Sequence, residues 1–232
     1  MNRFLNVFGF IALFFVLAVA SPAKAQEPHR TIFAVDVSGS STFLVDQTSA
    51  DAAGEFVEKY VVRLNAPHDL VMVSIGDAGL ARRLIDIEAK VTDRRASSAR
   101  RLAPQFGGYF RSLPELAKRG DLTAQGTTSL IAFLHSLEPA CKAGNTTVVA
   151  FTDAVEWSST VDGRAFAAGK VKLPEPEGAF LRGCEIRVLG VGQVKATLDS
   201  NGLAERLIPQ WRAYLTAAGA EPVSVVGDGF SF

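Results

Sequence analysis

TIFAVDVSGSSTFLVD, residues 31–46, begins as an apolar run and continues as a segment rich in hydroxyl groups. The apolar residues up to Val35 predict a strand that enters a core, and Asp36, Ser38 and Ser40 follow where that strand emerges. Alternate residues leaving a strand can point to the same side, so these three oxygen-bearing side chains can meet at one point. Such a group suits a small, hard cation such as Mg²⁺. The alternative is that Asp36 and the serines cap the next turn.

The remaining sequence predicts an α/β domain with a mainly parallel sheet. Continuous apolar runs are typical of strands that are buried on both faces of such a sheet. After the opening strand, we expect strands at residues 69–76, 146–153 and 184–192, and a last short one at 222–227. Apolar residues at helical spacing predict helices at residues 49–64, 129–137 and 203–220. Strands and helices therefore alternate, which is the pattern of an α/β fold.

Three intervening segments give weaker patterns. Residues 82–91 alternate between polar and apolar side chains, which predicts a half-exposed edge strand or hairpin partner. Residues 94–120 predict a mixture of helix and loop, because Gly107-Gly108 and Pro114 are typical interruptions. Residues 154–182 are rich in Gly and Pro and predict a long excursion with little helix.

The first 25 residues predict a secretory signal peptide. Arg3 precedes a short apolar run, and the small residues Ala23 and Ala25 follow it, so cleavage is expected after Ala25, or alternatively after Ala20. An uncleaved anchor is the other interpretation, but the apolar run is short for a span of roughly 20 residues. We therefore expect an exported protein, periplasmic or secreted.

Cleavage would leave 207 of the 232 residues, and residues 26–232 then form a single domain. The net charge would move from 0 to about −2, and nothing in that balance suggests nucleic acid. The mature chain has no second apolar stretch of membrane length, so we expect no stable membrane span after cleavage.

The expected export bears on the state of the two cysteines, Cys141 and Cys184. In an oxidising compartment an even pair is most simply one disulfide. A metal site is the weaker alternative, because the three histidines do not stand at ligand spacing from either cysteine.

Two further segments carry polar groups at places comparable to the first. QGTTSLIAFL, residues 125–134, opens a helix with a Gly-hydroxyl turn, so Thr127 or Thr128 can cap the helix or reach a nearby cation. VVAFTDAVEW, residues 148–157, places Asp153 just past a buried strand. Function gathers at the carboxyl ends of the strands in parallel sheets, and Asp36 and Asp153 both stand there.

Together the three segments resemble the von Willebrand factor A (vWA) domain family with its metal-ion-dependent adhesion site (MIDAS). The resemblance covers roughly residues 30–227. DVSGS matches the first motif of that family in full, at Asp36, Ser38 and Ser40.

The two later motifs depart from the family pattern at one glycine each. GTTSLIAFL matches the family's Gly-Gly-Thr turn best with Thr128 as the ligand, and Thr127 then replaces the second glycine and remains the alternative ligand. Asp153 matches the acid of the family's Thr-Asp-Gly, while Ala154 stands where Gly is usual. The loss of a glycine restricts the backbone, yet all five side-chain oxygens are present.

The resemblance implies a Rossmann-like three-layer sandwich, with a mainly parallel central sheet, one antiparallel edge strand and helices on both faces. It implies a bound Mg²⁺, for which Mn²⁺ or Ca²⁺ could substitute, with an open position that is filled by an Asp or Glu carboxylate of a partner protein. It also places Cys141 and Cys184 at or just before the amino ends of two neighbouring strands, opposite the metal.

Two other functions compete with this non-catalytic binding module. One is a phosphatase-like α/β hydrolase, because an Asp just after the first strand can act as a nucleophile. Here Ser38 replaces the second acid that such enzymes carry, and the Gly-x-Ser-x-Gly and His-Glu-x-x-His motifs are absent. The other is a structural scaffold in an envelope assembly.

Two local features also allow two interpretations each. The basic stretch RRASSARR, residues 94–101, is either a rim patch that attracts an acidic partner or a solvated helix face. Trp157, close to Asp153, either contacts a partner or packs under its own loop.

Overall fold

β1 (His29–Asp36) lies in the middle of the sheet, and its residues from Thr31 onward are all buried. Phe33 and Val35 face one hydrophobic cluster, whereas Ile32 and Ala34 face the other. Because successive side chains of a strand point to opposite faces, a continuously apolar strand requires cover on both sides. The sequence of β1 therefore requires a three-layer arrangement.

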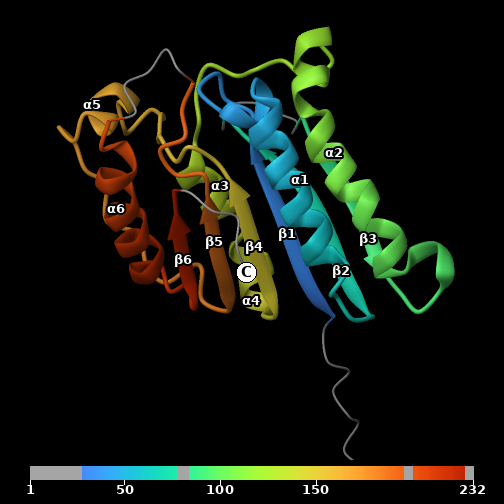
Figure 1. Cartoon of the computed structure of the whole chain (residues 1–232). Coiled ribbons are helices and arrows are strands. Elements are labelled where there is room, and N and C mark those ends of the chain that lie inside the picture. The colour runs from blue at the N-terminus through green and yellow to red at the C-terminus, as the bar shows by residue number, and fades with distance from the viewer. Residues whose placement is uncertain (1–27, 78–83, 196–200, 228–232) are drawn as a thin grey trace, which may run out of the picture.

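The computed structural model describes residues 28–77, 84–195 and 201–227, so the predicted signal segment lies outside the described residues. Six strands form one sheet in the order β3-β2-β1-β4-β5-β6. β3 is antiparallel to β2, and the other neighbouring strands are parallel. In Figure 1 the carboxyl ends of the parallel strands are at the top. The other strands are β2 (His68–Ile75), β3 (Asp86–Val91), β4 (Thr146–Phe151), β5 (Cys184–Leu189) and β6 (Val223–Val226).

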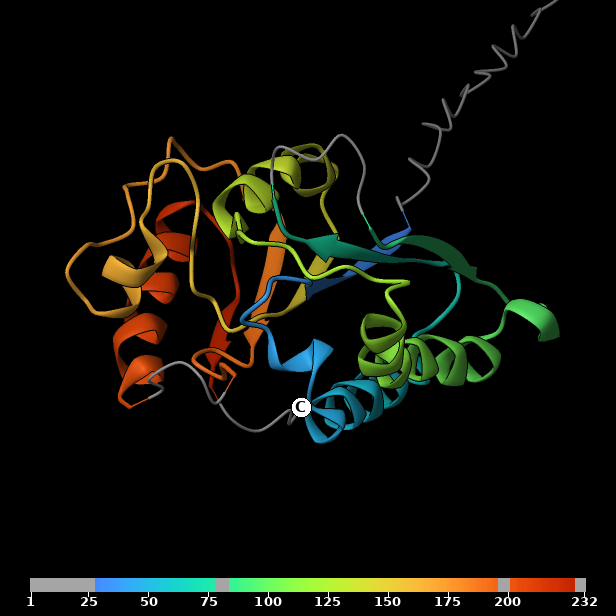
Figure 2. The same cartoon turned by 90° about the horizontal axis from the view of Figure 1, so that it is seen from above.

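Helices cover both faces of this sheet. α1 (Gln47–Val61) and α2 (Ala99–Arg119) pack on one face, and α3 (Leu130–Ser136), α4 (Glu138–Ala143) and α6 (Leu203–Ala217) pack on the other, as Figures 1 and 2 show. The long excursion at residues 154–182 contains only the short α5 (Gly163–Ala167), and two 3₁₀ turns complete the described elements, η1 (Thr42–Leu44) and η2 (Arg95–Ser97). The predicted Rossmann-like sandwich, with its antiparallel edge strand, is confirmed. Among the described residues, no helix is both long and apolar enough to cross a membrane.

The prediction of mixed helix and loop at residues 94–120 is wrong, because α2 runs without a break from Ala99 to Arg119. Gly107 lies where α2 meets α1: a Cβ there would stand 2.6 Å from the carbonyl oxygen of Gly54. This glycine therefore serves a close approach of two helices and does not interrupt one. On the same helix Phe106 and Phe110 are buried in the core.

We expect Gly107→Ala to destabilise the domain by about 1–3 kcal/mol, because the added methyl group must push α1 and α2 apart. Gly108 provides the control on the same helix, since a Cβ there would meet no atom within 4 Å. Gly108→Ala should stabilise by about 0.5–1 kcal/mol through helix propensity alone. Urea unfolding of both variants measures the difference, and equal effects would contradict the close packing.

The basic stretch at residues 94–101 lies far from the carboxyl ends of the parallel strands. β3 ends just before it, and Val91 at the end of β3 pairs with His68 at the start of β2. The stretch is therefore at the amino-terminal edge of the sheet, away from Asp36, and this position favours the interpretation as a solvated face.

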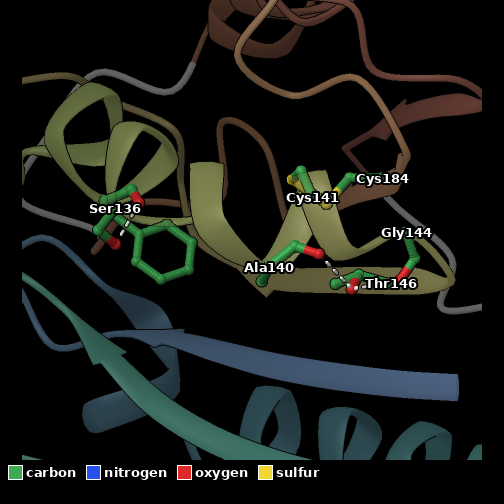
Figure 3. The surroundings of a disulfide bond; sticks show 7 residues. Ser136, Ala140, Cys141, Gly144, Thr146 and Cys184 are labelled. Atoms are coloured by element: carbon green, nitrogen blue, oxygen red, sulfur yellow. Dashed lines mark hydrogen bonds between the residues drawn. A yellow bond between two sulfur atoms is a disulfide. The ribbon is translucent and has the colours of Figure 1, made fainter. Parts of the chain in front are cut away.

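The structure joins Cys141 of α4 to Cys184, the first residue of β5, in a disulfide with the two Cα atoms 4.9 Å apart (Figure 3). Thr146, which pairs with Cys184 across the sheet, donates its hydroxyl to the carbonyl of Ala140 at 3.0 Å and so holds α4 against β4. The bridge closes the excursion between β4 and β5 at the amino-terminal edge of the sheet, opposite Asp36.

Candidate metal centre

Asp36, the last residue of β1, is fully buried and lies at the start of the hydroxyl-rich loop. Its Oδ1 accepts a hydrogen bond from the Ser38 backbone N–H at 2.8 Å, and its Oδ2 accepts one from the Thr152 hydroxyl at 2.7 Å. The hydroxyl oxygens of Ser38 and Ser40 are 3.1 Å apart. The three side chains that the sequence singled out in this loop therefore gather at one place.

Asp153 reaches the same place from the neighbouring strand. β4 pairs with β1 along its length, with Phe151 opposite Val35, so the chain leaves both strands at the same edge. Asp153 is fully buried, and its Oδ1 accepts a hydrogen bond from the Val155 N–H at 2.9 Å. Its Oδ2 is buried too and has no hydrogen-bond partner among the described residues. Strand order reverses between β1 and β4, and this is where ligands bind in open α/β sheets.

The two buried carboxylates disfavour each other's charge. Burial raises the pKa of Asp153 from 3.8 to about 7, the negative charge of Asp36 adds to this rise, and the Ser40 hydroxyl and the Val155 N–H offset part of it. Burial also raises the pKa of Asp36, although hydrogen bonds from Thr152, Ser38 and Thr128 oppose the rise. The charge of Asp36 acts on Asp153 because the chain leaves the paired strands β1 and β4 at the same edge of the sheet.

Thr128 comes from a third loop that the backbone ties to the other two. Gln125 exchanges backbone hydrogen bonds with Val37 and Gly39, at 2.9 and 2.7 Å, and the Thr128 carbonyl accepts one from the Trp157 N–H at 2.8 Å. Thr128 is buried beside Asp36, whereas Thr127 is only partly buried. The geometry therefore favours Thr128 over Thr127 as the oxygen ligand.

Ala154, in the loop after β4, occupies the position where the sequence pattern led us to expect a glycine. It adopts φ +60°, a left-handed conformation that costs an alanine roughly 1–2 kcal/mol. Its N–H donates to the Thr152 hydroxyl at 2.9 Å, and its carbonyl accepts from the buried indole N–H of Trp211 at 2.8 Å. These two contacts hold the backbone of Ala154 in this conformation, directly after Asp153.

The sequence did not assign roles to three residues that support the site. Thr152 precedes Asp153 in the Thr-Asp-Ala motif, and this position is the only sequence feature that points to it. Trp211 is distant in the chain, and no sequence pattern links it to the site. Glu156 is fully buried, and its Oε2 accepts from the Ile131 N–H at 3.1 Å, at the start of α3. Burial raises its pKa, and hydrogen bonds from Ile131 and its neighbours oppose the rise. Glu156 thus fastens the segment that carries Thr128.

The donor set fits a hard divalent cation. Asp36, Asp153 and three hydroxyls supply only oxygen, the ligand that Mg²⁺ and Ca²⁺ prefer. The unpartnered Asp153 Oδ2 and the mutual repulsion of the two carboxylates are the features that a bound cation would relieve. Among the described residues no three His, Cys, Asp or Glu side chains are grouped for a metal, so the hydroxyls are essential to this set.

We expect Thr128→Ala to weaken Mg²⁺ binding at least about tenfold, the loss that even an outer-shell partner of a metal typically causes. Thr127→Ala removes the same hydroxyl one residue earlier, at a partly buried position, and should leave the affinity nearly unchanged. Titration calorimetry of both variants measures this, and the opposite order would assign the ligand to Thr127.

No family model matches this chain, and neither does any curated protein. Several solved structures have a similar backbone fold. One is an aerotolerance-related membrane protein from Bacteroides fragilis, which has a TM-score of 0.47 and 16% sequence identity. The alignment covers 87% of this chain and 92% of that one. The manganese-loaded TRAP protein of Plasmodium vivax has a TM-score of 0.40 and 19% identity, over 78% of this chain and 63% of that one. The VWA domain of SpRpn10 has a TM-score of 0.40 and 11% identity, over 86% and 88%. At these scores, the similarities carry no argument about the site.

Proposed function

We propose that this chain is an exported, vWA-type module that binds a divalent cation, Mg²⁺ by preference, and uses it to bind a carboxylate of a partner protein. The ligands are Asp36, Ser38, Ser40, Thr128 and Asp153. The observation that carries the proposal is the convergence of two fully buried carboxylates from adjacent strands with three hydroxyls. One oxygen of Asp153 has no hydrogen-bond partner in the described part of the chain.

The donor set supports recognition of an acidic partner. Three of the five groups are neutral hydroxyls, so a divalent cation keeps more of its positive charge here than in a site made of carboxylates alone. When bound, the cation supplies an electrophilic position for a carboxylate oxygen. The side chains of the site would hold and orient the cation: Asp36, Ser38, Thr128 and Asp153 are buried, and Ser40 is partly buried.

The surroundings of Asp36 support binding without catalysis. A nucleophilic carboxylate needs a free oxygen that a phosphate group can approach. Both oxygens of Asp36 already accept hydrogen bonds, at 2.8 and 2.7 Å, and the residue is fully buried. Each oxygen keeps a second lone pair that a cation can use, but the burial of Asp36 leaves no approach for a phosphate group, and this disfavours the phosphatase-like alternative.

The disulfide supports export. A bridge between Cys141 and Cys184 persists in an oxidising compartment and is rare in the cytosol. Together with the signal-like first 25 residues, it favours a periplasmic or secreted protein. A scaffold in an envelope assembly would share this location but would need no accessible cation.

Binding of a carboxylate peptide tests the proposal. The probe is the capped pentapeptide Gly-Asp-Gly-Leu-Gly, and its Asn counterpart, which has the same shape without the charge, is the control. We expect the Asp peptide to bind in the presence of Mg²⁺ and to be released by a chelator, while the Asn peptide does not bind. Binding that persists in the chelator would contradict a role for the cation.

A further inference from the structure

An apolar cavity of about 260 Å³ adjoins the candidate metal centre. Ser40 is a member of the ligand set and also lines the cavity, so the two are adjacent. The cavity lies between the loop after β4, α5 and the start of α6. Figures 1 and 2 show these segments at the carboxyl-terminal end of the sheet. The lining residues include Ser40, Trp157, Arg164, Ala168, Leu203 and Arg206.

The walls of this cavity are built to hold their shape. Trp157 packs its ring so closely over Gly163 that a Cβ there would stand 2.9 Å from ring atoms. The Asp162 carboxylate accepts from the Ala165 N–H at 2.8 Å and fixes the start of α5. On the other side the Arg206 Nε–H donates to the Ala167 carbonyl at 3.0 Å, which ties α6 to α5. A preformed cavity binds a ligand without the cost of ordering its own walls.

The chemistry of the lining points to a mixed ligand. Trp157 is 37% exposed although it is among the largest apolar side chains of the chain, and Leu203 forms a buried wall. The Arg164 guanidinium lies 5.8 Å from the centre of the Trp157 ring. Among the described residues neither Arg164 nor Arg206 forms an ion pair. Arg206 donates to backbone carbonyls, those of Ala167 and Asn201. Two positive charges that form no ion pair among the described residues, around an apolar hollow, favour a ligand that carries acidic groups beside an apolar side chain.

We infer that this cavity receives a large apolar side chain of the same peptide segment whose carboxylate binds the cation, so that the partner is recognised by an acidic and an apolar residue two positions apart. In an extended backbone, residues i and i+2 point to the same side about 7 Å apart. We choose this spacing because Ser40 belongs to both the ligand set and the cavity lining, so the two binding positions are adjacent. The inference rests on the proposed function, because the carboxylate anchors the segment at Ser40.

The test compares peptides that differ only in the apolar side chain. Capped Gly-Asp-Gly-Leu-Gly and its reverse, Gly-Leu-Gly-Asp-Gly, are measured against versions in which Ser replaces Leu, all with Mg²⁺ present. We expect at least one Leu peptide to bind about tenfold more tightly than its Ser version, since a buried Leu side chain contributes on that scale. Equal affinities of the Leu and Ser peptides in both directions would overturn the inference while leaving carboxylate binding intact.

A variant that fills the cavity provides the second arm. Ala168 lines the cavity and is exposed, so Ala168→Phe should erase the preference for Leu without weakening the Ser peptides. Ala143→Phe is the matched control, at an exposed position at the end of α4 near the disulfide. A preference for Leu that survives in Ala168→Phe would place the apolar side chain elsewhere. If no Asp peptide binds although Mg²⁺ still stabilises the protein, the proposed carboxylate binding fails and the inference fails with it.

Discussion

Replacing Asp153 with Asn should abolish Mg²⁺ binding and at the same time make the metal-free protein more stable at pH 8. The variant keeps an oxygen that can accept the Val155 N–H, but it removes the buried charge that faces Asp36. We expect a gain of about 2 kcal/mol, because an uncompensated buried charge is costly. For a domain of this size that gain corresponds to about 5 °C in melting temperature.

Thermal unfolding at pH 8, with Mg²⁺ and with chelator, checks both parts of this prediction. Asp93→Asn is the matched control, because Asp93 is exposed and lies near the end of β3, at the opposite edge of the sheet. It should change neither the melting temperature nor the response to Mg²⁺. A destabilised Asp153→Asn protein would mean that the carboxylate is stabilising by itself and that no cation is needed to balance it.

The pH dependence of the metal-free protein should be unusual in sign. The pKa of Asp153 is about 7 in the folded protein, against 3.8 for an ordinary Asp. Between these values the folded state holds a proton that the unfolded state has lost, so stability is highest below about pH 4 as far as this group is concerned. It falls as the pH rises through 7, by at most about 4 kcal/mol.

Mg²⁺ binding should show the opposite trend, because the cation competes with the proton on Asp153. With a pKa of about 7, the affinity should drop about tenfold between pH 8 and pH 6. Calorimetric titrations at the two pH values measure this change in affinity. In a separate unfolding experiment without metal, the Asp153→Asn protein should not show the fall in stability above pH 4. A Mg²⁺ affinity that does not change between pH 6 and pH 8 would contradict the raised pKa.

The strands and the gathering of ligands could be predicted because they depend on local patterns. β1, β2 and β4 are largely apolar on both faces, as buried parallel strands are, whereas the edge strand β3 alternates. β5 is intermediate, because Glu185 and Arg187 lie on one of its faces. Asp36 and Asp153 follow such strands, and parallel strands end at the same edge of a sheet. The proximity of these two residues therefore follows from the order of the chain.

The features that escaped prediction depend on contacts between distant segments. From sequence alone, Gly107 indicates a break in a helix. Its actual role depends on the close packing of Gly54 of α1 against it. From sequence alone, Ala154 is a departure from the expected glycine. Its conformation is supported by a hydrogen bond from the indole N–H of Trp211, 57 residues further along the chain, to its carbonyl. The cavity beside Ser40 requires α5 and α6 to meet, and no pattern within either helix announces that contact.

The most direct test of the metal centre is calorimetric titration of Mg²⁺ into residues 26–232 at pH 8, with Mn²⁺ as a second cation and Ser38→Ala as the variant. The expected result is one cation bound per chain, and binding at least about tenfold weaker in Ser38→Ala. A matching rise in melting temperature with Mg²⁺ is expected in the unaltered chain alone. Absence of binding for both cations, with a melting curve that a chelator leaves unchanged, would contradict the metal centre.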